Sequence, residues 1–359
     1  MDETTTSEQL TALFQKDADS PYLIAGPCSA ETEEQLIHTA RQLQNSGIRL
    51  FRSGVWKPRT RPGTFEGNGT SAFAWLKRVK KETGLPVAIE IANPIHIGHA
   101  LNHDIDVLWI GARTTVNPFM VQDIADALKG IDIPVLVKNP VNPDLDLWIG
   151  GIERIQKAGV TQIAAVHRGF SSYAKTKFRN PPYWEIPVEL RRRMPDIPLI
   201  CDHSHICGNR ESLLSVAQYA LDLNYDGIMT EVHHDPDNAW SDAQQQITPE
   251  SYKQMISSLR LRKEYSDDEK FVETLDMLRH KIDEIDQELI DLLARRMDIS
   301  ERIGDVKRKN NIAILQVARW NEIIRNALAH GSEIGLSEEF IMKYLSAIHQ
   351  ESIDRQSQE

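Results

Sequence analysis

The stretch PVLVKNPVNPDLDLWIGGIERIQKAGVTQIAAVHRG, residues 134–169, decides the fold of the first part of the chain. Two short apolar runs, PVLVKNP from Pro134 and QIAAVHRG from Gln162, flank a helix-like segment at Leu147–Gly159. Neither run alternates strictly between apolar and polar residues, which is typical of parallel strands buried on both faces. The final glycine of the middle segment is typical of a helix end. The stretch therefore predicts one β-α-β unit.

Six further apolar runs repeat this pattern on either side of it. They are YLIAG, IRLFRSG, PVAIEIA, VLWIGAR, PLICDHSH and GIMTEVHH, which begin at residues 22, 48, 86, 107, 198 and 227. Together with the two runs above, they give eight alternations of strand and helix. This number favours a closed (β/α)8 TIM barrel, and an open doubly wound sheet is the alternative.

The strand pattern stops after about residue 262. A charged stretch follows, and Phe271 to about Lys309 then carries apolar residues at the spacing of one long helix. Two more helices are expected near Ala318–His330 and Ser337–Arg355. The expected organisation has three parts: a barrel at 1–262, a linker at 263–270 and an all-α domain at 271–359.

Composition limits the classes of partner and the location. The 359 residues carry a formal net charge of -11, which argues against nucleic acid and anionic membranes as partners. The first 19 residues lack the features of a signal peptide, and no run approaches the ~18 apolar residues of a membrane span. Three cysteines are too few for a disulfide framework, so we expect a cytoplasmic protein with reduced thiols.

Each predicted strand ends in a reactive or charged residue, and functional side chains of such barrels come from these ends. In chain order these residues are Cys28, Arg52, Glu90, Arg113, Lys138, Arg168, His205 and Glu231. With Lys57, five cations are expected to converge on one rim of an acidic protein. This convergence favours binding of phosphate and carboxylate groups over a structural ion-pair network.

A second group on the same rim mixes a thiol, an imidazole and two carboxylates: Cys28, His205, Glu231 and Asp242. Such donors suit a divalent transition metal such as Mn²⁺, Fe²⁺ or Zn²⁺. The alternative is a small buried cysteine beside a solvated, histidine-rich loop. The position of the histidine ligand also has three rivals: His203, His233 and His234.

The motifs GPCSAE, LFRSGVWKPRT, IGAR, VLVKNP, HRGF, DHSH and EVHHDPDNAWSDAQQQ resemble the type I 3-deoxy-D-arabino-heptulosonate 7-phosphate (DAHP) synthases, and most closely their β subgroup. The resemblance covers about Tyr22–Leu259. KPRT at Lys57–Thr60 is its most discriminating part, because the sister 3-deoxy-octulosonate 8-phosphate synthases carry a different motif there. The chain departs from the usual pattern after KPRT, where it reads RPGTF, and at His203, where proline is common.

This resemblance implies the first step of the shikimate pathway, a condensation of phosphoenolpyruvate with erythrose 4-phosphate. It implies four metal ligands, Cys28, His205, Glu231 and Asp242, with Mn²⁺ as the first expectation and Fe²⁺, Co²⁺ or Zn²⁺ as alternatives. The implied phosphoenolpyruvate residues are Arg52, Lys57, Glu90, Ala112, Arg113, Lys138 and Arg168, among which Lys57, Glu90 and Lys138 are the catalytic candidates. Arg59 and Thr60 are implied for erythrose 4-phosphate. A Schiff-base aldolase that uses Lys138 is the rival chemistry.

In the tail, Arg279, Arg296 and Lys307 lie on or beside the apolar stripe of the long helix. Cations on an apolar seam are costly unless they are paired. Either carboxylates of a helical bundle pair with them, or a dianionic ligand binds inside the bundle.

The tail is similar to the small all-helical chorismate mutases over about Phe271–Gln356, and LRHKIDEIDQELIDLLARRMDISERIGDVK carries much of the likeness. The implied site residues are Arg279, Arg296, Lys307, Arg319, Ser352 and Gln356. Gln316 and Trp320 depart from the family pattern, in which Asp and Glu are common. The implied reaction rearranges chorismate to prephenate without acid, base or cofactor. The resemblance also implies a homodimer, in which each site takes Arg279 from the partner.

We therefore expect a bifunctional enzyme with a synthase barrel and a mutase tail. The alternative for the tail is a non-catalytic dimerisation and regulatory domain that senses chorismate or prephenate.

Overall fold

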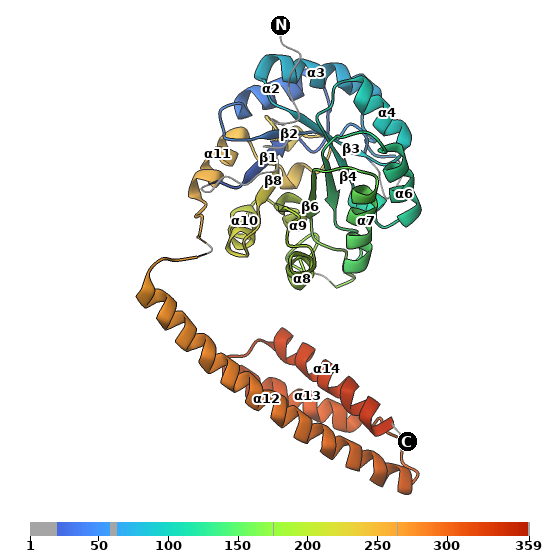
Figure 1. Cartoon of the computed structure of the whole chain (residues 1–359), viewed down its shortest axis with the longest axis vertical. Coiled ribbons are helices and arrows are strands. Elements are labelled where there is room, and N and C mark those ends of the chain that lie inside the picture. The colour runs from blue at the N-terminus through green and yellow to red at the C-terminus, as the bar shows by residue number, and fades with distance from the viewer. Residues whose placement is uncertain (1–19, 58–62, 175, 264, 358–359) are drawn as a thin grey trace. The chain divides into compact units, whose positions relative to one another are not determined.

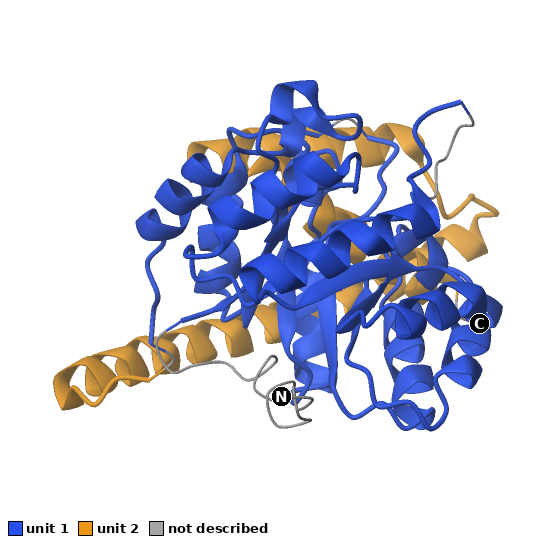
Figure 2. Ribbon diagram, turned by 90° about the horizontal axis from the view of Figure 1, so that it is seen from above, with its two compact units in different colours: residues 1–264 blue, residues 265–359 orange. Residues whose placement is uncertain are grey.

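The computed structural model describes residues 20–57, 63–174, 176–263 and 265–357. The chain divides into two compact units, Met1–Glu264 and Tyr265–Glu359, which Figure 2 colours separately. The boundaries predicted from the sequence, with a linker at 263–270, stay a prediction.

The first unit confirms the predicted barrel. Its eight strands are β1 (Tyr22–Gly26), β2 (Leu50–Arg52), β3 (Val87–Ile91), β4 (Val107–Ile110), β5 (Val135–Lys138), β6 (Ile163–His167), β7 (Leu199–Asp202) and β8 (Gly227–Glu231). Each strand pairs in parallel with the next, and β8 pairs with β1, so the sheet closes in chain order (Figure 1). The open sheet is therefore excluded.

Helices surround the strands of this barrel (Figure 1). They are α2 (Glu33–Leu43), α3 (Ala72–Thr83), α4 (Pro94–Asn102), α5 (Ala112–Thr115), α6 (Pro118–Ala127), α7 (Leu145–Lys157), α8 (Glu185–Arg193), α9 (His203–Cys207), α10 (Leu213–Asp222) and α11 (Pro249–Ser258). Two of the apolar runs predicted as strands thus end in the short helices α5 and α9. Asp202 explains the second change, because its side chain accepts from the backbone N–H of His205 as the N-cap of α9.

The inside of the barrel is filled by apolar residues that alternate along each strand, such as Leu50, Leu136, Ile200 and Met229. Because side chains of a strand alternate between its two faces, the residue two positions further on also points inward. This rule brings a layer of charged residues to the carboxyl ends of the strands: Arg52, Glu90, Lys138, Arg168, Asp202 and Glu231.

The second unit consists of α12 (Glu269–Lys309), α13 (Val317–Glu333) and α14 (Glu338–Ser357). Gly304 lets α12 approach α14 closely, since a Cβ there would lie 2.8 Å from the Cα of Gln356. The first half of α12 instead leaves its apolar stripe exposed, with 57% of Ile282 and 56% of Ile285 accessible. Among the residues described, no helix is both long and apolar enough to cross a membrane.

Candidate active sites

A polar pocket opens at the carboxyl ends of the barrel strands. Its lining residues are Lys57, Glu90, Gly111, Ala112, Arg113, Lys138, Val141, Arg168, Arg179, His205 and Asp242. The structure thus brings together most of the residues that the sequence predicts for this rim. Arg59 and Thr60 lie outside the described residues.

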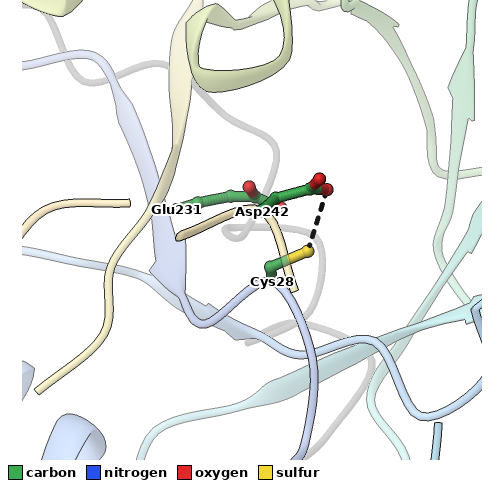
Figure 3. A group of neighbouring side chains, drawn as sticks. All are labelled: Cys28, Glu231 and Asp242. Atoms are coloured by element: carbon green, nitrogen blue, oxygen red, sulfur yellow. Dashed lines mark hydrogen bonds between the residues drawn. The ribbon is translucent and has the colours of Figure 1, made fainter. Parts of the chain in front are cut away.

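Three of the four predicted metal ligands form a cluster beside this pocket. One donor atom each of Cys28, Glu231 and Asp242 lies within 4.8 Å of the others, and Figure 3 shows these side chains. The Cys28 Sγ lies 3.4 Å from Asp242 Oδ2. His205 is the fourth expected ligand, and its Nε2 lies 3.8 Å from Glu231 Oε1. A thiol, two carboxylates and an imidazole at these positions fit a divalent transition metal.

The local backbone places the two loop ligands. Gly26 has a φ of +149°, and a Cβ there would collide with the backbone oxygen of Arg52, so only glycine lets β1 run this close to β2 before Cys28. The N–H of Cys28 donates to Gln246 Oε1 at 2.9 Å. Asp242 has a φ of 48°, in the left-handed region that non-glycine residues rarely adopt. Tertiary contacts must hold this conformation.

Arg52 lies beneath the cluster of Cys28, Glu231 and Asp242 and does not line the pocket. Only 1% of its side chain is exposed, and its Nη1 donates to Glu231 Oε1 at 2.6 Å. Burial alone would raise the pKa of Glu231, but the neighbouring His205 and Arg52 outweigh it and lower the pKa to about 2. The contacts of Arg52 therefore hold Glu231 ionised and in place. Its expected role in substrate binding stays a prediction.

Asp202 joins two predicted site residues, although sequence reasoning missed it. Its carboxylate accepts from Lys138 Nζ at 2.6 Å and lies 3.0 Å from His205 Nδ1. Burial lowers the pKa of His205, which favours the neutral ring that a metal needs. A carboxylate that accepts from Nδ1 leaves Nε2 as the free ligand atom. The sequence did hold a sign of this position. Asp202 follows the inward-facing Ile200 by two positions, so the alternation along the strand predicts that its side chain also points into the barrel.

Cys28 is a buried thiol that lies near both a carboxylate and an ammonium group. Burial, followed by the charge of Glu231, raises its pKa to about 12. The Lys57 Nζ nevertheless lies 2.9 Å from its Sγ. A metal ion binds the thiolate, so loading this site releases a proton.

The pocket also gathers positive charge around Arg168. Burial and the nearby cations Arg113 and Arg179 lower the pKa of Arg168 to about 10. Its Nη1 donates to Asn180 Oδ1 at 2.7 Å, which fixes the guanidinium. Because these cations repel one another, an anionic ligand that binds between them is strongly stabilised.

Arg179 is a second residue that sequence reasoning missed. It lies on the loop after β6, and its Nη1 donates to Asp242 Oδ1 at 3.0 Å and to Gln245 Oε1 at 2.8 Å. No local motif marks it, since its partner lies 63 residues further along the chain.

The helical unit holds a separate cavity. Its polar lining residues are Arg295, Arg296, Ser300, Lys307, Gln316, Arg319, His349, Ser352 and Gln356, with Trp320 and six aliphatic residues among the rest. Arg296 Nη1 donates to Ser352 Oγ, and Lys307 Nζ donates to Gln356 Oε1 at 3.0 Å. No carboxylate lines this cavity in the described part of the chain. The residues predicted for the tail site thus come together with one exception.

Arg279 is the exception. It lies 17 residues before Arg296 on the straight run of α12, or about 25 Å along the axis. Its Nη1 lies 3.4 Å from Asp276 on the exposed surface. Arg279 therefore cannot reach the cavity of its own chain.

The fold and the first site define a class of protein: a closed (β/α)8 barrel with a cation-lined pocket beside side chains that fit a divalent metal. The model of the DAHP synthetase I family matches residues 7–267, and the chain belongs to this family. The model of chorismate mutase type II matches residues 278–357, so both domains are fused in one chain.

Individual proteins agree with this assignment. The phospho-2-dehydro-3-deoxyheptonate aldolase of Thermotoga maritima is 28% identical over 238 residues, which cover 66% of this chain and 68% of that protein. A 2-dehydro-3-deoxyphosphooctonate aldolase of Legionella pneumophila is 26% identical and covers 71% of this chain and 98% of its own. The crystal structure of the Thermotoga maritima DAHP synthase superposes with a TM-score of 0.60 at 29% identity, over 66% of this chain and 67% of that one.

Proposed function

We propose that the barrel condenses phosphoenolpyruvate with erythrose 4-phosphate to DAHP and phosphate, and that the helical unit rearranges chorismate to prephenate. The two matched family models support both activities. The observation that carries the first is a pocket lined by several cations beside the cluster of Cys28, Glu231 and Asp242.

In the barrel, Arg113, Lys138 and Arg168 bind the phosphate and carboxylate groups of phosphoenolpyruvate. Carbon 3 of this substrate attacks the aldehyde carbon, water adds at carbon 2, and the bond to phosphate breaks. The aldehyde oxygen takes up a proton. Lys57, whose Nζ lies beside Cys28, is the proposed donor of this proton. Glu90 faces the same pocket as a candidate acid or base.

Cys28, His205, Glu231 and Asp242 would hold the divalent metal, which supplies a Lewis acid for the aldehyde when bound. We propose Mn²⁺, with Fe²⁺, Co²⁺ and Zn²⁺ as the alternatives that metal analysis distinguishes. The Schiff-base rival is disfavoured because Asp202 holds Lys138 Nζ at 2.6 Å, and a paired ammonium has no lone pair for a carbonyl.

The names of the relatives give two products of different length, a deoxyheptonate and a deoxyoctonate, and the tail favours the shorter one. The shorter product corresponds to a four-carbon aldehyde. KPRT resembles the motif of DAHP synthases, and a chorismate mutase belongs to the same aromatic biosynthesis. A paired assay tests this choice: phosphoenolpyruvate consumption with erythrose 4-phosphate against arabinose 5-phosphate, before and after exhaustive chelation. Consumption with the five-carbon sugar alone would refute the choice, and activity unaffected by metal removal would refute the metal site.

For the helical unit, Arg296 and Arg319 are the proposed contacts of the chorismate carboxylates, and Ser352 holds Arg296 in place by accepting from its Nη1. Lys307 and Gln356, already 3.0 Å apart, face the ether oxygen. The rearrangement needs a held conformer and charge stabilisation only. If the chain leaves chorismate unchanged, the tail is the alternative non-catalytic sensor.

We propose a homodimer through α12. The exposed apolar stripe with Ile282 and Ile285 is suited to packing against a second copy of the chain. Arg279 cannot reach the cavity in the helical unit of its own chain. Mixing two inactive variants, Arg279→Ala and Arg296→Ala, should restore up to about a quarter of the mutase activity, since half of the dimers are mixed and half of their sites are intact. Activity of Arg279→Ala alone at the wild-type level would exclude the shared site. A cytoplasmic location agrees with the three free cysteines and is part of the proposal.

A further inference from the structure

A tryptophan and a histidine lie face to face in the wall of the tail cavity. Trp320 of α13 and His349 of α14 both line it, with ring centroids 3.9 Å apart and planes 11° from parallel. Stacking fixes the plane of the imidazole and leaves its edge for hydrogen bonding. Within the described chain, neither ring nitrogen of His349 has a hydrogen-bond partner.

His349 is surrounded by permanent cations. Arg296 and Lys307 of α12 and Arg319 of α13 line the same cavity. Burial, and then the charges of Arg296 and Lys307, lower the pKa of His349 below its usual range. The ring is therefore neutral at neutral pH and offers one donor and one acceptor. The arginines and lysines of the cavity can only donate.

The groups of chorismate can be matched to the groups of the cavity. Its two carboxylates suit the arginines, and its ether oxygen suits Lys307 and Gln356. Its ring hydroxyl remains, and this group donates one hydrogen bond and accepts others. Ser352 Oγ is already engaged, because it donates to the backbone oxygen of Ile348 at 2.7 Å and accepts from Arg296. Gln356 Oε1 already accepts from Lys307.

Three polar side chains are left for the hydroxyl: Ser300, Gln316 and His349. Ser300 is the least accessible of them, since only 6% of the residue is exposed. Gln316 is exposed, makes no capping hydrogen bond at the start of α13 and must be ordered by the ligand. His349 is half-buried and its plane is already set by Trp320, so less conformational entropy is lost when it binds.

We propose that His349 binds the ring hydroxyl of chorismate, with Trp320 as the platform that orients it. This role rests on the proposed mutase function. His349 would then be a specificity-determining residue, because its hydrogen bond forms only with a substrate that carries the hydroxyl.

The test compares two substrates in the full chain. His349→Phe keeps a ring against Trp320 but removes both nitrogens. Its substrates are chorismate and the analogue with hydrogen in place of the hydroxyl. For chorismate, the variant should lose about tenfold in kcat/KM, the value of one hydrogen bond in a cavity. For the analogue, variant and wild type should agree within about twofold. Turnover of the analogue serves as the internal control for folding of the helical unit.

Three outcomes would overturn the proposal. An equal loss with both substrates would make His349 a packing residue. A loss confined to chorismate in Gln316→Ala and absent from His349→Phe would assign the hydroxyl to Gln316. A wild-type chain that turns over neither substrate would remove the mutase function itself, and this role with it.

Discussion

Asp202→Asn is the change that most directly tests how the barrel site is built. Asp202 is fully buried, and its carboxylate contacts both Lys138 Nζ at 2.6 Å and His205 Nδ1 at 3.0 Å. An amide has the same shape and caps α9 equally well. However, it carries one NH2 group, which must face the ammonium of Lys138 or the N–H of His205. At least one donor then meets another donor, and the charge of Lys138 loses its partner.

The size of the effect follows from these contacts. Breaking one partner of a buried ion pair costs about 3–5 kcal/mol, so the free energy of unfolding of the barrel should fall by about that amount. This is a large share of the roughly 5–15 kcal/mol that holds a domain folded. Because the orientation of His205 is lost as well, metal affinity should fall by about 10–100-fold.

Three measurements check the prediction. Urea unfolding followed by circular dichroism gives the stability, and competition with a fluorescent chelator gives the metal affinity. Mutase turnover should be unchanged, because the helical unit is a separate compact unit. Asp146→Asn is the matched control, since Asp146 is 86% exposed in a surface ion pair with Arg193 and should cost less than about 1 kcal/mol. The reasoning is wrong if Asp202→Asn matches this control in both stability and metal affinity.

Three further changes have defined outcomes. Gly111→Ala should displace the Glu90 carboxylate, with which its Cβ would collide, and should lower synthase turnover while sparing the mutase. Normal phosphoenolpyruvate consumption would contradict this. Arg179→Ala should weaken metal binding by about tenfold, because Asp242 loses the contact at 3.0 Å, and Arg179→Lys should recover part of the affinity in chelator competition. Burial lowers the pKa of His167 from 6.5 to about 3. Between these two pH values the unfolded chain therefore binds a proton at His167 and the folded chain does not. The free energy of unfolding should therefore fall as the pH drops from 6.5 towards 3. In His167→Gln, a plot of the urea midpoint against pH should have a flatter slope than in the wild type. An unchanged slope would count against a neutral buried ring.

The strands and the charged ends of the barrel could be predicted because they are local properties. A run such as VLVK shows its own burial, and the alternation of side chains carries Lys138 to the same face as Leu136 whatever the rest of the chain does. The stripe of the long tail helix is local in the same sense, as are the cations along it. Residue type then narrows the chemistry, since a thiol, an imidazole and carboxylates together suit a metal.

Pairing between distant residues had to come from the tertiary structure. Arg52 and Glu231 are 179 positions apart and meet only because β8 closes against β1. The sequence places Arg52 at a strand end with the other cations, but only the closed barrel shows that it lies below the pocket and supports a ligand. Asp202 and Arg179 were missed for the same reason, since their partners come from other strands and loops.

The sequence by itself determined the barrel, the helical tail and the residue types of both sites, because periodicity and strand ends are read within a few neighbouring positions. The tertiary structure alone decided which of these side chains contact one another. It stacked Trp320 on His349, and it left Arg279 about 25 Å along α12 from Arg296. Such contacts depend on how whole elements pack, and packing is settled by all the side chains of a layer together.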